Sequence, residues 1–124
     1  EFNNFMEEEI YQMMVATTED QDELILENTT TLKVARWWNR ACDIIPCNGG
    51  KDIGIQKILD YFNFNKEEAM AFGDGGNDIS MLKYVGTGVA MGNAKDDVKA
   101  IADYITDSVQ EDGIVSALKH FDIL

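Results

Sequence analysis

The stretch that decides the fold is AMAFGDGGNDISML, residues 69–82. An apolar run ends at Gly73, two carboxylates follow at Asp74 and Asp78, and an apolar, helix-like segment comes next. This order predicts a strand, a tight glycine-rich loop and a helix start. The N–H groups of such a loop favour an anion, while the two carboxylates favour a hard cation. The stretch therefore predicts a metal site beside a phosphate.

Helices and short strands alternate through the chain after position 48. The predicted elements are a helix over 52–62, a strand over 69–72, a helix over 77–84, a strand over 88–91, a helix capped by Asn93 that runs through Ile101, a strand over 103–106 and a helix over 113–121. This alternation is typical of an α/β fold with a parallel, doubly wound, Rossmann-like sheet. Such sheets bind ligands at the carboxyl ends of their strands, where Asp74 lies.

The preceding part of the chain differs in composition, because all ten glycines lie after position 48. Its predicted elements are a strand over 10–17, a short helix that begins near 18–20, and a β-hairpin of two strands over 31–38 and 41–46. We therefore expect two domains: an α+β unit over 1–46 and the parallel α/β unit over 47–124.

The formal net charge of −13 disfavours nucleic acid and anionic membranes as partners. An anionic substrate would feel the same repulsion, so it needs a cation or a local lysine. Cys42 and Cys47 fit no zinc pattern, and we expect buried or half-buried free thiols in a reducing, cytoplasmic setting. No segment is long and apolar enough to span a bilayer, so we expect no membrane partner.

Two polar residues near the glycine-rich loop leave alternatives open. Asn77 can donate its amide to a phosphate oxygen or serve as the helix N-cap, and spacing alone favours neither. Lys51 follows a glycine turn and opens a helix. There it can reach a phosphate, hold two carboxylates together or remain solvated, as most lysines at helix starts do.

Other motifs are interpreted as structural. The chain's single Asp-x-Asp, at 20–22, is followed by Glu and Leu rather than by a glycine and a small hydroxyl residue. The glycines of 86–92 are displaced from dinucleotide-loop spacing. His120 lies near the end of the last predicted helix. Trp37 and Trp38 face opposite sides of a strand, which assigns one to the core and the other to a substrate or a missing part of the protein.

These residues resemble a known family. Residues 71–82 closely resemble the fourth motif of haloacid dehalogenase (HAD)-like phosphatases of the Cof-type, class IIB capped branch. Three later segments resemble the next strand and the tail of that group: 88–94, 102–107 and 111–114. Lys51 is similar to the third-motif lysine, although Asp52 stands where the family usually has glycine. The resemblance covers about residues 45–124, and 1–45 look like the end of the α/β cap.

The resemblance implies a Mg²⁺-dependent phosphatase for small phosphorylated metabolites, with sugar phosphates favoured. In that family an aspartate attacks the phosphoryl group to form an aspartyl-phosphate, and a second aspartate two residues later acts as general acid and base. Asp74 would ligate Mg²⁺, and Asp78 would support the ion, through water. Lys51 would contact the phosphate and the nucleophile, and Asn77 would contact the phosphate. Lys51, Asp74 and Asp78 are the expected catalytic residues.

The family's first motif, an apolar strand followed by Asp-x-Asp-Gly-Thr or Val, is not found in this sequence, nor is its second-motif Ser or Thr. Family members are roughly twice this long. We therefore expect the C-terminal half of a phosphatase, inactive by itself. Its strand over 69–72 would have an unpaired edge that recruits a second copy, a swapped segment or the missing half. The alternative is a non-catalytic truncated module that binds a metal or partner and self-associates through this edge.

Overall fold

The computed structural model describes residues 9–124, so the first eight residues of the predicted cap remnant lie outside the described residues. The chain divides into two compact units, 1–49 and 50–124. Each unit contains a three-stranded sheet of its own. The identification of the first unit as a cap remnant stays a prediction.

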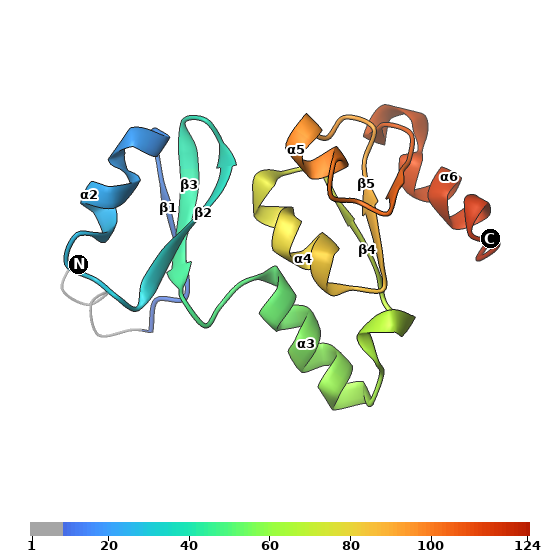
Figure 1. The fold of residues 1–124 in the computed structure, drawn as a ribbon, viewed down its shortest axis with the longest axis horizontal. Coiled ribbons are helices and arrows are strands. Elements are labelled where there is room, and N and C mark those ends of the chain that lie inside the picture. The colour runs from blue at the N-terminus through green and yellow to red at the C-terminus, as the bar shows by residue number, and fades with distance from the viewer. Residues whose placement is uncertain (1–8) are drawn as a thin grey trace. The chain divides into compact units, whose positions relative to one another are not determined.

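The sheet of the first unit is antiparallel, with strand order β1-β3-β2 (Figure 1). Its elements are β1 (Met13–Val15), α2 (Asp22–Leu26), β2 (Leu32–Trp38) and β3 (Ala41–Pro46). The predicted hairpin is therefore present. The predicted strand over 10–17 is wrong in length, because only three of its residues form a strand with β3. Val15 pairs with Cys42, so β3, which begins at Ala41, has almost no backbone left to pair with the residues that follow.

Arg36 ties the hairpin of this unit to its helix. Its guanidinium donates to the backbone oxygen of Thr17 at 2.8 Å and forms an ion pair with Asp22, the first residue of α2. The strand register shifts between Arg36 and Trp38, so the two tryptophans sit at an irregularity of β2. Trp37 is half-buried and Trp38 is 52% exposed.

The two cysteines of the first unit are free and differ in exposure. Cys42 is fully buried in β3, and this burial raises the pKa of its thiol. Cys47 is exposed. The expectation of buried or half-buried thiols is therefore correct for Cys42 and wrong for Cys47, which lies just beyond the end of β3.

The second unit is an α/β domain with a parallel sheet of order β4-β5-β6, which confirms the predicted fold class. Its elements are α3 (Lys51–Phe62), β4 (Met70–Gly73), α4 (Ile79–Tyr84), β5 (Thr87–Ala90), α5 (Asp96–Lys99), β6 (Tyr104–Ile105) and α6 (Gly113–His120). Figure 1 shows α4 and α6 on opposite sides of this sheet, as in a doubly wound fold. Three short 3-10 turns precede β4, α4 and α6.

The core of the second unit lies between the sheet and the helices that cover one of its faces. Its buried members come from β4, α4, β5 and the α5 region: Ala71, Leu82, Val85, Ala90, Ala94 and Val98. Leu82 and Val98 are almost completely removed from water. Burying a side chain of this size stabilises a fold by about 1.5–3 kcal/mol, so these two residues hold α4 and α5 against the sheet.

Strand β4 is an edge strand in the part of the chain that the structure describes. It pairs with β5 over four residues, from Met70 with Thr87 to Gly73 with Ala90. The sheet order agrees with the expectation of an unpaired edge at this strand. The loop that follows β4, with Asp74, therefore lies at the border of the described sheet rather than at its centre.

Candidate functional site

The carboxylate of Asp78 is the centre of the loop that follows β4. Its Oδ2 accepts hydrogen bonds from the backbone N–H groups of Asp74 and Gly75, each at 3.0 Å. Its Oδ1 accepts from Nζ of Lys51, a residue 27 positions earlier in the chain. Asp78 is only 5% exposed, so these bonds form largely out of water. The side chain thus closes the glycine-rich loop and attaches the start of α3 to it.

The surroundings of Asp78 keep it ionised. Burial by itself would raise the pKa of this carboxyl, because a charged group loses hydration. The hydrogen bond from Lys51, the two backbone N–H bonds and the lysine charge outweigh that effect, and the pKa is lowered. A negative charge therefore remains at this position in mildly acidic as well as neutral solution.

Two glycines position this ion pair. A Cβ placed on Gly73 would lie 2.6 Å from the Cβ of Asp78, so only a residue without a side chain allows Asp78 to approach the end of β4. Gly50, the N-cap of α3, has a φ of 137°, a value that other residues rarely adopt. It turns the chain so that Lys51 becomes the first residue of α3. Local backbone geometry thus brings two distant segments together.

Lys51 remains partly open to solvent while it contacts Asp78. Its side chain is 50% exposed. An ammonium group has three N–H donors, and one of them is used on the Asp78 carboxylate. The structure therefore places the lysine on one carboxylate rather than between two, and it leaves donors available to a further anion. The contact of Lys51 with a phosphate stays a prediction.

Asp74 differs from Asp78 in its exposure and its partners. It is exposed at the end of β4, and its Oδ2 accepts from Nδ2 of Asn93 at 2.9 Å. Asn93 follows β5 and also accepts, at its Oδ1, from the backbone N–H of Val109 at 3.1 Å. The prediction that Asn93 caps the next helix is wrong: α5 begins at Asp96 with Lys95 as its N-cap, because the Asn93 amide is occupied by these two contacts.

Sequence reasoning missed the contact between Asn93 and Asp74, although a signal for it exists. The carboxyl ends of neighbouring parallel strands meet at one edge of the sheet. Asp74 directly follows β4, and Asn93 comes shortly after the paired strand β5. A polar residue near the end of one strand is therefore a candidate partner for a polar residue after the next.

Asn77 lies in the 3-10 turn Gly76–Asp78, between the two carboxylates. The N-cap of that turn is Gly75 and the N-cap of α4 is Asp78, so the cap interpretation of Asn77 is wrong. Its contact with a phosphate stays a prediction. Asp52, which stands where the resemblance expects glycine, accepts from the hydroxyl of Ser80 at 3.1 Å and so links α3 to α4 beside the lysine.

The loop fits a magnesium ion through Asp74 rather than through Asp78. Among residues 9–124, Asn93 is the one protein donor to the Asp74 carboxylate, so Oδ1 remains available to a cation. Both oxygens of Asp78 already accept hydrogen bonds. The described residues contain no cluster of three or more Asp, Glu, His or Cys side chains suited to a metal. Mg²⁺ does not require one, since it commonly keeps several waters and binds through one or two carboxylates plus substrate phosphate.

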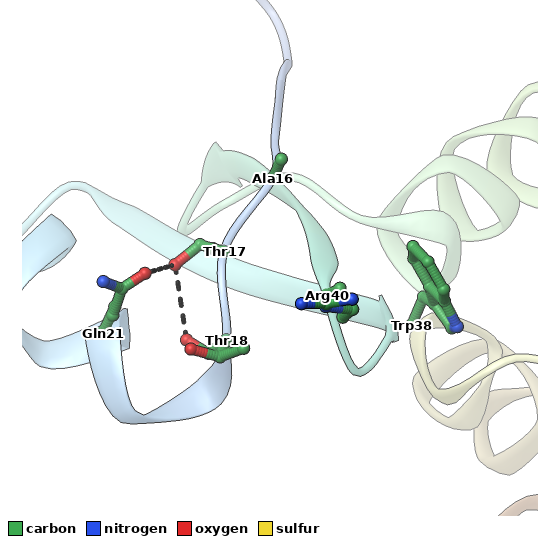
Figure 2. Close-up of a pocket in the computed structure, with 6 residues that line it drawn as sticks. All are labelled: Ala16, Thr17, Thr18, Gln21, Trp38 and Arg40. Atoms are coloured by element: carbon green, nitrogen blue, oxygen red, sulfur yellow. Dashed lines mark hydrogen bonds between the residues drawn. The ribbon is translucent and has the colours of Figure 1, made fainter.

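A separate hollow of about 420 Å³ lies in the first unit (Figure 2). It is lined by Ala16, Thr17, Thr18, Gln21, Trp38 and Arg40. The Thr17 hydroxyl donates to Oε1 of Gln21 at 2.7 Å, which orders one side of the hollow. None of the residues predicted for catalysis lines it. Trp38, the exposed tryptophan, does, in keeping with the expectation that one tryptophan faces away from the core.

Comparison with known proteins identifies the family. The sequence pattern of the haloacid dehalogenase-like hydrolases matches residues 1–118. The chain belongs to this family. YkrA of Bacillus subtilis (strain 168) is 40% identical over 116 residues, which make up 94% of this chain and 45% of YkrA. Kanosamine-6-phosphate phosphatase of the same strain is 43% identical over 77 residues, 62% of this chain and 27% of that enzyme.

Solved structures of HAD-like proteins superpose closely on the chain. A sugar phosphatase of HAD subclass IIB is 44% identical, with a TM-score of 0.90 over 99% of this chain and 47% of its own. This chain therefore spans less than half the length of that phosphatase and of YkrA. Separately, none of the helices formed by residues 9–124 has the length and apolar character needed to cross a membrane.

Proposed function

We propose that this chain supplies the magnesium-binding and phosphate-binding half of a HAD-like phosphoric monoester hydrolase that acts on small phosphorylated metabolites. The observation that carries the proposal is the arrangement at the end of β4. There the buried Asp78 holds Lys51 and the loop of Asp74 together. An exposed carboxylate for a cation and an ammonium for a phosphate are thereby attached to one loop.

Each of these side chains has a role suited to its exposure. Asp74 is the direct ligand of Mg²⁺, and Asp78 supports the ion through water while it fixes the loop. Lys51 donates its remaining N–H groups to the phosphate and to the attacking aspartate, and Asn77 donates its amide to the phosphate. Bound Mg²⁺ would offset the negative charge on the phosphoryl oxygens. Together these groups would counter the repulsion between an anionic substrate and a protein of net charge −13.

The attacking group in the proposed reaction is an aspartate of the family's first motif, which residues 1–124 do not contain. Its oxygen forms a bond to phosphorus as the bond to the substrate oxygen breaks, and that oxygen takes a proton from the second aspartate of the motif. The open edge of β4 is where the strand bearing this motif would pair. We propose that the chain has no turnover by itself and associates with that half.

Phosphorylated sugars are the substrate class that the comparisons favour. A kanosamine-6-phosphate phosphatase and a subclass IIB sugar phosphatase are among the similar proteins. Both names describe a phosphate ester on a small polyhydroxylated compound. We propose a substrate of this class, converted in the cytoplasm, where the free thiols of the chain would remain reduced.

A fusion enzyme tests this function. The part of YkrA that this chain does not cover is joined to the chain, and release of inorganic phosphate from sugar phosphates is measured with and without Mg²⁺. We expect Mg²⁺-dependent turnover from the fusion and none from the chain alone. Asp74→Asn should lower the fusion's activity by about 100-fold or more, because even the outer partners of metal ligands contribute 10–100-fold. Asp60→Asn, the same charge change on an exposed residue of α3, is the matched control.

Two outcomes of this experiment contradict the proposal. Mg²⁺-dependent turnover by the chain alone would show that it contains its own nucleophile. A fusion that is folded by circular dichroism, active, and equally active with Asp74→Asn and Asp60→Asn would remove Asp74 from the site. Sedimentation of the chain alone addresses the second candidate, a non-catalytic module that self-associates through the edge of β4. A monomer at all concentrations argues against that module.

A further inference from the structure

The side chain of Asn93 connects three loops at the carboxyl ends of the parallel strands. It stands in the loop after β5, donates to Asp74 after β4, and accepts from Val109 after β6. The two contacts measure 2.9 Å and 3.1 Å. No motif of the sequence assigns this residue a role in the site, and the contact involves the carboxylate that is proposed to bind the metal.

The chemistry of the two partners determines which way the Asn93 amide points. An ionised carboxylate only accepts hydrogen bonds, and a backbone N–H only donates. The amide oxygen must therefore face Val109, and the amide nitrogen must face Asp74. These partners exclude the flipped arrangement of the amide. Asn93 is thus a donor held in position by its own acceptor contact.

The backbone around Asn93 is anchored on both sides. The N–H of Met91 donates to the carbonyl of Gly73 at 2.9 Å, and the N–H of Gly92 donates to the carbonyl of Asp107 at 3.0 Å. The loop of Asn93 is therefore bonded to the end of β4 and to the loop after β6. Asp74 and Asn93 are both exposed side chains, and Asp74 lies on a glycine-rich loop whose backbone is bonded to Asp78. A carboxylate in that setting gains orientation from a neighbour that is itself held in position.

We propose that Asn93 is a positioning residue, which holds the Asp74 carboxylate by Oδ2 and leaves Oδ1 available to a magnesium ion. This inference rests on the proposed function, since it assigns Asp74 to the metal. A neutral amide suits the task better than an ammonium, because it donates a hydrogen bond without placing a positive charge beside a cation. The contact with Val109 extends the support of the metal loop to the segment before α6.

Three variants separate the parts of this arrangement. Asn93→Ala removes both contacts. Val109→Pro replaces the N–H that orients the amide with a ring carbon, so it disrupts the contact on the oxygen side of Asn93 while the Asp74 carboxylate stays in place. The position of Val109 is the first of a 3-10 turn after an extended Ser108, where proline is accommodated, and its side chain is 60% exposed. Ser108→Ala is the matched control: it removes the hydroxyl bond to Glu111 in the same segment and leaves Asn93 intact.

Binding of Mn²⁺ to the chain is the readout, measured by paramagnetic broadening of backbone amide signals and competed with Mg²⁺. We expect the dissociation constant to rise by about 10–100-fold for Asn93→Ala, as is typical for outer partners of metal ligands. Val109→Pro should raise it by a smaller factor, and Ser108→Ala should leave it within about twofold. Thermal unfolding of each variant shows whether any change follows from lost stability instead.

The outcomes distinguish this inference from the function on which it rests. If the wild type does not bind Mn²⁺, or binds it as well after Asp74→Asn, the assignment of Asp74 to the metal fails and the inference fails with it. If the wild type binds through Asp74 but Asn93→Ala binds as tightly as Ser108→Ala, the proposed function stands and the role of Asn93 is refuted. An affinity unchanged by Val109→Pro would refute the part assigned to Val109.

Discussion

Gly73→Ala should destabilise the second unit, because this glycine is where β4 meets Asp78. The added Cβ would lie 2.6 Å from the Cβ of Asp78 and 3.0 Å from its Cγ and Oδ2. Carbon atoms in contact are normally about 3.5–4.0 Å apart, so either the strand or the aspartate must move by about 1 Å. A shift of Asp78 by that distance lengthens its bonds to Lys51 and to the loop N–H groups.

The loss of stability in Gly73→Ala follows from these two ways of relieving the clash. Overpacking a well-filled site costs about 1–3 kcal/mol. Losing one hydrogen bond to a charged group costs about 1.5–3 kcal/mol, and the protein takes the cheaper route. We therefore expect a loss of about 1–3 kcal/mol in the free energy of unfolding. In urea, followed by far-ultraviolet circular dichroism, this lowers the midpoint by about 1 M if the denaturant slope stays unchanged.

Gly54→Ala provides a control with the opposite expected sign. Gly54 lies in the interior of α3, and an added Cβ there meets nothing within 4 Å. The substitution should stabilise by about 0.5–1 kcal/mol, because alanine loses less backbone freedom than glycine in a helix. Equal effects of Gly73→Ala and Gly54→Ala would refute the claim that Asp78 requires the missing side chain of Gly73, as would a Gly73→Ala variant as stable as the wild type.

Three further substitutions examine the same unit. The pKa of Asp78 is lowered in the fold, so its ionised form adds stability above its unfolded pKa of about 3.9, and this stability is lost as the pH falls through the folded pKa. Urea titrations in acidic buffers should therefore show a smaller loss of unfolding free energy for Asp78→Asn than for the wild type. Equal losses would contradict the lowered pKa of Asp78. Lys51→Met should lower the free energy of unfolding by about 1–2 kcal/mol, because one oxygen of the buried Asp78 carboxylate loses its partner and the half-exposed lysine limits the effect. The carboxyl ¹³C signal of Asp78 should then titrate at higher pH. An unchanged titration would refute the ion pair. Thr106→Val should lower the free energy of unfolding by about 1–3 kcal/mol, because the buried Thr106 hydroxyl donates to the carbonyl of Gly113 at 2.6 Å. In the same urea titrations Thr106→Ser, which keeps the hydroxyl, should recover most of that loss. A Thr106→Ser variant as unstable as Thr106→Val would assign the effect to packing.

The elements of the second unit could be predicted because each is bounded by a local signal. Glycine or a polar turn follows the strands, and apolar spacing defines α3 and the segment of α4. The predicted strand over 69–72 is observed at Met70–Gly73 for this reason. The strand over 10–17 was overestimated because alternation reports a preference for extended backbone, whereas the strand length depends on how much of β3 remains to pair.

The contacts of the site could be predicted only in part. Asp74 and Asp78 share one loop, so sequence spacing places them together. The ion pair between Lys51 and Asp78 joins segments 27 residues apart, and sequence spacing alone does not predict it. The capping role expected of Asn93 was wrong because its partners, Asp74 and Val109, come from other strands. The local preference of asparagine for helix N-caps does not predict a side chain whose hydrogen bonds go to other strands of the fold.

The different roles proposed for Asp74 and Asp78 follow from their different surroundings. For Asp78 to ligate Mg²⁺ directly, the ion would have to share Oδ1 with the positively charged Lys51, because Oδ2 already accepts from two N–H groups. Mg²⁺ holds its waters strongly, so an ion at Asp74 can meet Asp78 through one of them at a greater distance from the lysine charge. Asp74 has an oxygen available and is exposed. The buried carboxylate is therefore better suited to hold the loop, and the exposed one to hold the metal.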